Sequence, residues 1–252
     1  MVDYLQLITF KMKKLVICNL KQYSLKQDYK TYQKDVEQQS DKVELIIAPQ
    51  AIDMHFFNNN NNKIKLAAQN VSKYEEGAYT GEISVKSLKN NNVKYCLVGH
   101  YERKEYNETT KDIIDKIILL TDNDIKPILS IGETKEEYDT NKTLSVIESQ
   151  IANIYNYLPY DSIDKIIISY EPSWMIGNEN NINKEEIEKT INTIKAIVNS
   201  YYEVNPKVIY GGGVDNKKIR LIKEINSLDG IIIGSKSTDS DSLKSIIEIL
   251  TT

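Results

Sequence analysis

Hydrophobic residues along the chain gather in eight short runs that are rich in β-branched side chains. The runs cover residues 14–18, 43–48, 64–68, 93–98, 126–131, 165–170, 207–210 and 230–233. Apolar and polar positions do not alternate within them, as "KVELIIA" and "DKIIISY" show. Such continuous apolarity indicates strands that are covered on both faces, which is the environment of a parallel sheet.

The segments between these runs show a helical spacing of apolar positions. The clearest is 184–203, where one face is apolar and the other is charged. Its apolar positions are Ile187, Ile191, Ile194 and Val198. We predict further helices at residues 108–120, 136–156, 215–225 and 239–250. Strand and helix therefore alternate along the chain, with no change of composition that would mark a linker.

Eight strand–helix units in 252 residues fit a single-domain (β/α)₈ barrel of the α/β class. A doubly wound open sheet is the alternative, because alternation alone does not reveal whether the sheet closes. We assign residues 14–252 to this domain and predict an N-terminal extension at 1–13, which lacks the pattern of a secretory signal. The polar stretch "FFNNNNNK" at 56–63 predicts an exposed loop.

Composition narrows the possible partners. No apolar run approaches the about 20 residues that span a bilayer, so we expect no membrane association. The chain has 32 basic and 36 acidic residues, and its net charge of −4 offers no general attraction for nucleic acid. Cys18 and Cys96 lie inside apolar runs, which predicts small buried side chains in a reducing compartment, the cytoplasm, with neither a disulfide nor zinc.

Chemically useful residues follow the predicted strands. They are Asn19, Lys21, Gln69, Asn70, His100, Glu133, Glu171, Gly211 to Gly213, Gly234 and Ser235. In either parallel architecture the carboxyl ends of the strands meet at one edge, so we expect these residues to share a site. Each alone has an ordinary structural explanation: a hydrogen-bonded histidine, a solvated lysine or a glycine in a turn. No metal-ligand cluster is present, and the glycines do not have the spacing of a dinucleotide-binding loop.

The sequence motifs around these residues are more specific than the residues taken singly. The motifs "NLK", "AAQN", "GAYTGEIS", "LVGHYERK", "SIGE", "YEPSWMIG", "YGGGVD" and "DGIIIGS" occur in this order. In order and spacing the chain resembles the triosephosphate isomerase family from about residue 14 to its end. The resemblance implies a TIM barrel and the interconversion of dihydroxyacetone phosphate and glyceraldehyde 3-phosphate, without any cofactor.

The resemblance also implies a role for each matching residue. Glu171 matches the base that moves a proton between two carbons, and His100 matches the group that polarises the carbonyl, as a neutral imidazole if a helix begins there. Lys21 and Asn19 match the residues beside the developing enediolate. The matching phosphate-binding positions are Gly177, Gly213, Gly234 and Ser235.

Other matches concern the surroundings of the site. Residues 172–182, which include Trp174, match a loop that closes over the substrate. Glu102 and Arg103 match residues that support the site by ion pairing. Thr80 matches a threonine that reaches into the neighbouring subunit, and this implies a homodimer.

The chain departs from the family where Gly213 replaces a serine, and in the lid residues after Gly177. Tyr101, Ser130 and Ser235 are further replacements, and none removes a reacting group. Two alternatives stay open at this point. One is another sugar-phosphate isomerase or aldolase barrel, with Lys21 as a Schiff-base nucleophile. The other is a barrel that binds phosphorylated ligands without turning them over.

Overall fold

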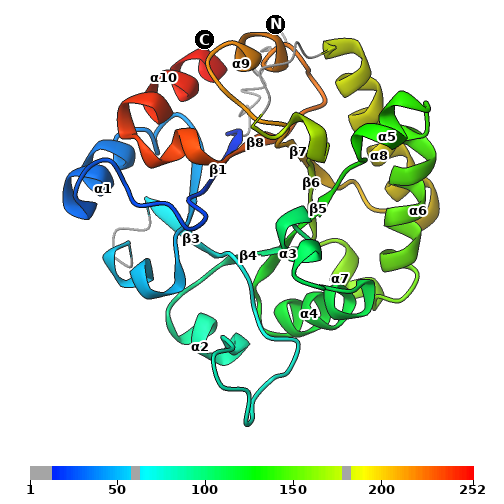
Figure 1. The fold of residues 1–252 in the computed structure, drawn as a ribbon, viewed down its shortest axis with the longest axis horizontal. Coiled ribbons are helices and arrows are strands. Elements are labelled where there is room, and N and C mark those ends of the chain that lie inside the picture. Colours follow the sequence, from blue (N-terminus) through cyan, green and yellow to red (C-terminus); the bar gives the residue numbers. More distant parts are fainter. Residues whose placement is uncertain (1–12, 58–62, 178–182) are drawn as a thin grey trace, which may run out of the picture.

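The barrel predicted from the sequence is closed. A computed structural model describes residues 13–57, 63–177 and 183–252. Its parallel strands are β1 (Leu15–Asn19), β2 (Glu44–Ala48), β3 (Ile64–Ala68), β4 (Tyr95–Val98), β5 (Lys126–Ile131), β6 (Ile167–Tyr170), β7 (Lys207–Tyr210) and β8 (Gly230–Ile233), paired in chain order around a closed barrel (Figure 1). Because β1 pairs with both β2 and β8, the alternative of an open sheet is excluded.

The wall of the barrel separates two apolar cores. Leu15 and Ile17 belong to the cluster inside the barrel, whereas Val16 and Cys18 belong to the cluster between the strands and the helices. Successive side chains of a strand point to opposite faces, so both sets must be apolar. This is why the runs do not alternate in the sequence. Cys96 also lies in the outer cluster, so both cysteines are buried as expected.

Helices surround the barrel (Figure 1). They are α1 (Tyr29–Glu37), α2 (Val85–Asn90), α3 (Tyr101–Glu105), α4 (Thr110–Asp122), α5 (Lys135–Asp139), α6 (Thr143–Tyr155), α7 (Tyr160–Ile163), α8 (Lys184–Tyr202), α9 (Lys218–Ile222) and α10 (Ser240–Thr251). Short 3-10 turns form η1 (Ala51–Phe56), η2 (Ser173–Met175) and η3 (Ser235–Thr238). Within the described part of the chain, no helix has both the length and the apolarity to cross a membrane.

Two of the predicted helices are interrupted or shortened by the local backbone. The segment 136–156 is divided into α5 and α6, because Asn141 adopts a left-handed conformation with φ of 57° between them. The segment 215–225 contains only the short helix α9. Asp215 accepts hydrogen bonds from the backbone N–H groups of Lys217 and Lys218 at 2.9 and 2.8 Å, and this turn delays the start of the helix.

The prediction for residues 56–63 is wrong at its beginning. Phe56 ends η1, and Phe57 is buried against the ring of Tyr32, with the two centroids 6.1 Å apart. A large aromatic side chain gains more from burial than the adjacent asparagines gain from solvation. Residues 58–62 lie outside the described residues. So does the expected N-terminal extension, except for Lys13.

Candidate active site

Most of the residues predicted at the strand ends share one cavity, and the exceptions, which do not line it, are Gln69, Asn70, Glu133 and Gly212. A hollow of about 430 Å³ lies at the carboxyl ends of the strands. Its lining includes Asn19, Lys21, His100, Glu171, Gly177, Gly213, Gly234 and Ser235. The predicted convergence of these residues is therefore found in the structure. Thr80 is not among the lining residues, because it lies on the exposed loop between β3 and α2.

Glu171 and His100 approach each other closely at the bottom of this cavity. Glu171 directly follows β6, and His100 follows β4 after Gly99. Oε2 of Glu171 lies 3.6 Å from Nε2 of His100. The exposed fractions of the two side chains are only 6 % each, so water screens their interaction weakly. A carboxylate and an imidazole in this arrangement can exchange a proton with one small ligand.

A serine on the neighbouring strand holds the carboxylate of Glu171. Ser130 of β5 donates a hydrogen bond from Oγ to Oε1 of Glu171 at 2.8 Å. Burial alone raises the pKa of Glu171, but the adjacent His100 and the Ser130 hydroxyl favour the ionised form more strongly, so its pKa lies below the ordinary value. Glu171 is therefore charged at neutral pH. Sequence reasoning noted Ser130 only as a replacement.

The imidazole of His100 is oriented by the start of α3. The backbone N–H of Glu102 donates to Nδ1 of His100 over a long 3.4 Å, which makes His100 the N-cap of that helix. A ring nitrogen that accepts a hydrogen bond carries no proton, so the neutral ring holds its proton on Nε2. That nitrogen is the one nearest to Glu171.

Lys21 adopts a rare backbone conformation that directs it toward the same cavity. Its φ is 51°, in the left-handed region that is unfavourable for a non-glycine residue. Gln69 stabilises this turn by donating to the carbonyl oxygen of Lys21 at 2.9 Å, and Asn19 accepts from the backbone N–H of Lys21 at 3.2 Å. The ammonium of Lys21 contacts Oε1 of Glu102 at 2.6 Å.

This contact is the ion pair that was expected for Glu102. It links the cation after β1 to the residue that caps His100. The expectation for Arg103 is wrong, because among the described residues its guanidinium forms no ion pair and lies 6.0 Å from the ring centroid of Tyr106. Nε of Arg103 is buried without a hydrogen-bond partner among the described residues.

The glycine turn after β7 packs closely against the site. A Cβ atom on Gly211 would lie 2.5 Å from Cγ of Glu171, so any larger residue would displace the acid. Gly213 has φ of 67°, and its N–H donates to the carbonyl oxygen of Gly211 at 2.8 Å. This N–H is already engaged, so it becomes a phosphate donor only if its peptide rotates.

Glu133 accepts hydrogen bonds from the last residue of β6 and from the segment that follows this strand. Tyr170 donates to this buried carboxylate at 3.2 Å, and Nε1 of Trp174 also donates to it at 3.2 Å. Burial raises the pKa of Glu133, while these donors and its own backbone N–H oppose that rise. The ring of Trp174 packs at 4.4 Å from that of Tyr138. The sequence placed Glu133 at a strand end but revealed no task for it.

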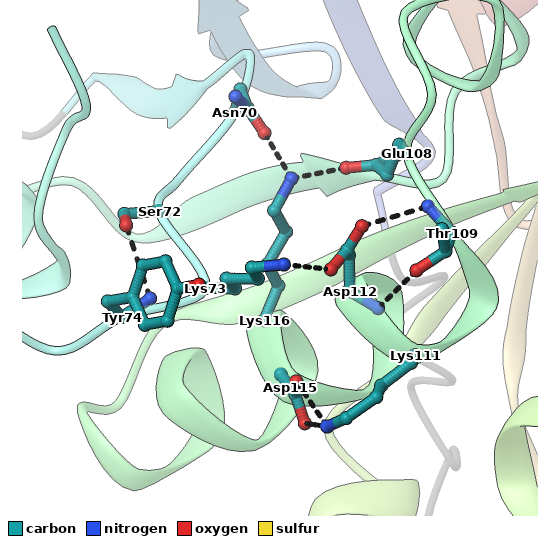
Figure 2. A network of polar contacts seen from close by, with 10 residues as sticks. All are labelled: Asn70, Ser72, Lys73, Tyr74, Glu108, Thr109, Lys111, Asp112, Asp115 and Lys116. Carbon is teal, nitrogen blue, oxygen red and sulfur yellow. Dashed lines mark hydrogen bonds and ion pairs between the residues drawn. The ribbon is translucent and has the colours of Figure 1, made fainter. Parts of the chain in front are cut away.

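A polar network lies beside the strand end that carries His100, and Figure 2 shows its side chains Asn70, Glu108 and Lys116. Glu108 accepts from the backbone N–H of Gly99 at 3.1 Å and forms a buried ion pair with Lys116 of α4. Lys116 also donates to Asn70 at 2.8 Å, which connects α4 to the end of β3. Sequence reasoning included Asn70 but missed Glu108 and Lys116, because the contact of Lys116 with Asn70 spans 46 positions and no motif marks the pair.

A closed parallel barrel with a carboxylate, an imidazole and an ammonium group at the carboxyl ends of its strands is the arrangement of a (β/α)₈-barrel enzyme. A family model described as triosephosphate isomerase matches residues 14–250. The chain is 36% identical to the triosephosphate isomerase of Mesomycoplasma hyorhinis, over 83% of this chain and 82% of the relative. It is 32% identical to that of Dictyoglomus turgidum, over 93% of this chain and 98% of the relative.

These matches cover nearly the whole barrel. The chain belongs to the triosephosphate isomerase family of enzymes. The resemblance seen in the strand-end motifs is thereby confirmed, together with its starting point near residue 14.

Proposed function

We propose that this chain interconverts dihydroxyacetone phosphate and D-glyceraldehyde 3-phosphate through an enediolate, with Glu171 as the base and His100 as the electrophile. The observation that carries the proposal is the approach of Oε2 of Glu171 to Nε2 of His100, at 3.6 Å in one cavity. This division of roles is the one established for triosephosphate isomerases.

The proton transfer needs only groups that the chain provides. The ionised Glu171 removes a proton from the carbon next to the carbonyl, and the electron pair of that C–H bond forms the double bond of the enediolate. Negative charge develops on the former carbonyl oxygen, to which His100 donates a hydrogen bond from Nε2. Lys21 and Asn19 stabilise the same charge. Glu171 then returns its proton to the neighbouring carbon. The proton of the substrate hydroxyl passes by way of Nε2 of His100 to the former carbonyl oxygen, so the carbon that carried the hydroxyl becomes the new carbonyl.

The contact between Glu171 and His100 must change when substrate binds. A separation of 3.6 Å between Glu171 and His100 leaves no room for a carbon atom between them. We infer that the carboxylate of Glu171 turns from His100 toward the substrate, exchanging its contact with the ring for one with the reacting carbon. The backbone of Glu171 would stay in place during this movement, because its N–H donates to the carbonyl oxygen of Ile131 at 2.8 Å.

The phosphate group would bind beside the glycine turns that line the cavity. Gly177, Gly213, Gly234 and Ser235 border it there, and backbone N–H groups at such turns bind anions with little reorganisation. The chain as a whole has a net charge of −4, so the attraction for a phosphate must be local. Residues 172–182 would close over the bound substrate and exclude water. Residues 178–182 of this segment lie outside the described residues.

We further propose a homodimer in the cytoplasm. The loop between β3 and α2 projects from the barrel (Figure 1), and Thr80 is exposed on it. The rings of Tyr74 and Tyr79 stack within this loop, with centroids 3.9 Å apart, so it presents a defined surface to a partner. Sedimentation should show a dimer that the change Thr80→Glu weakens. A monomeric wild-type protein would contradict this part of the proposal.

A coupled assay with glyceraldehyde 3-phosphate tests the reaction. Glu171→Asp withdraws the carboxylate by one methylene, so turnover should fall by about a hundredfold or more while binding of the phosphate is retained. Glu248→Asp, the same change on the exposed face of α10, is the matched control and should leave the rate unaltered. Equal rates in wild type and Glu171→Asp would exclude Glu171 as the base.

The same assay separates the two alternative functions. A barrel that only binds phosphorylated ligands would show affinity for the substrate without turnover in the wild type. An aldolase-type enzyme would form a Schiff base with Lys21, and mass spectrometry would detect the adduct after borohydride reduction.

A further inference from the structure

Lys218 is a buried lysine close to the proposed phosphate site. It is the first residue of α9, and only 5 % of its surface is exposed. The turn at Asp215 holds its backbone in place and directs its side chain inward. Burying an ammonium group is unfavourable unless polar groups surround it, so a lysine at this position calls for a physical explanation.

The contacts of Lys218 join two segments that border the cavity. Its Nζ donates to the carbonyl oxygen of Met175 at 3.4 Å and to that of Gly212 at 3.3 Å. Met175 belongs to the segment after β6, and Gly212 belongs to the glycine turn after β7. One buried ammonium therefore connects the two chain segments that contribute Gly177 and Gly213 to the cavity.

The ammonium also occupies the space beside Gly213. A Cβ atom on Gly213 would lie 3.1 Å from Nζ of Lys218 and 2.5 Å from the carbonyl oxygen of Met175, with the backbone N of Gly177 at 3.5 Å. A side chain at residue 213 would therefore compete with Lys218 for one location. The hydroxyl that this chain lacks at residue 213 is replaced by a cation that reaches the same place from α9.

The peptide between Gly212 and Gly213 is the point where this cation can act on ligand binding. Its carbonyl oxygen accepts from Lys218, and its N–H donates to Gly211. Turning the N–H toward a phosphate moves the carbonyl oxygen away from Lys218. The ammonium then faces the added negative charge, which it stabilises strongly because water is excluded from its surroundings.

We propose that Lys218 is a positioning residue of the phosphate site, where its buried ammonium holds the segment after β6 against the glycine turn and places positive charge behind the glycine N–H groups. The inference rests on the proposed function for the identity of the substrate. Burial lowers the pKa of Lys218, although the charge of Asp215 opposes this, so a nearby phosphate dianion would relieve an unfavourable charge.

Binding of inorganic phosphate tests the proposal without any turnover. Calorimetry at constant ionic strength should show binding to Lys218→Met that is about tenfold weaker than to the wild type, the usual effect of one charged contact. Lys217→Met removes the same charge from the exposed neighbouring residue and should change the affinity by less than about twofold. If Lys218→Met does not fold, Lys218→Gln keeps a hydrogen-bond donor and still removes the charge.

Kinetics with two substrates distinguishes this role from a general structural one. For glyceraldehyde 3-phosphate, Lys218→Met should raise KM by about tenfold with a smaller change in kcat. For glyceraldehyde, which has no phosphate, kcat/KM should stay within about twofold of the wild type. An equal loss for both substrates, or unchanged affinity for inorganic phosphate, would overturn the proposal. A wild type that binds phosphate through Lys218 but does not isomerise would refute only the proposed function.

Discussion

Replacing Ser130 with alanine removes the hydroxyl that donates to Oε1 of Glu171 at 2.8 Å. Ser130 has an exposed fraction of 3 % and Glu171 one of 6 %, so water cannot readily take the place of the lost donor. A hydrogen bond to a charged group contributes about 1.5–3 kcal/mol. We expect the lower end of this range, because His100 remains beside the carboxylate.

The sign of the effect follows from the pKa of Glu171. This pKa is lowered in the folded protein by His100 and Ser130, against the effect of burial, and losing Ser130 raises it again. A change of about 1.5 kcal/mol corresponds to roughly one pKa unit. The base is active only when ionised, so the acid limb of the kcat/KM profile should move to higher pH by about one unit.

The assay is the pH dependence of kcat/KM for Ser130→Ala, Ser130→Cys and the wild type. Cysteine is a weaker donor than serine, so its profile should lie between the other two. The substrate phosphate titrates near pH 6 in all three reactions, so the ionisation of Glu171 appears as a second, steeper limb at lower pH, and that limb is the one compared. Ser162→Ala removes a buried hydroxyl that contacts Thr121 and should lower stability without moving the profile. An acid limb of Ser130→Ala that coincides with the wild type would refute the reasoning.

Two further changes test the network of Figure 2 by urea unfolding. The pKa of Asp112 is held at about 2, chiefly by the hydrogen bond from Lys73. Asp112→Asn should therefore destabilise the protein by about 1 kcal/mol near neutral pH, allowing for the partial exposure of Lys73, and this difference should disappear as the pH falls from about 4 to about 2. Lys116→Met leaves the buried carboxylate of Glu108 without its cation and should cost about 3–5 kcal/mol, part of which Glu108→Gln in the same chain recovers. If Lys116→Met has the same free energy of unfolding as the wild type, water reaches the carboxylate of Glu108.

The elements that sequence reasoning predicted well are those with locally complete signals. The apolar face of 184–203 matches α8, because helical spacing and burial agree over five turns of chain. Shorter elements were less predictable. Asn141 ends α5 through its own left-handed conformation, and Phe57 is buried through contact with Tyr32, twenty-five positions earlier in the sequence. Asparagine can adopt several backbone conformations, so the left-handed one at Asn141 was not predictable. The burial of Phe57 depends on a partner that is distant in the sequence.

The composition of the site was accessible from the sequence for a topological reason. The carboxyl ends of parallel strands lie at one edge, so residues such as Lys21, His100 and Glu171 were expected to meet. The contacts that hold these residues in place could not be predicted from the sequence. Glu108 reaches back to the N–H of Gly99, and Gln69 holds the strained turn at Lys21, through contacts that no local pattern announces.

The sequence by itself determined the strands, their burial on both faces and the set of groups at one end of the barrel, because these depend on side-chain character and chain order. Tertiary structure alone decided that β1 pairs with β8, that Ser130 holds Glu171 and that Lys218 fills the space beside Gly213. The first two contacts join residues distant in the chain, and the third depends on the direction of the Lys218 side chain. Closure brings such groups within hydrogen-bonding distance, and their order along the chain does not.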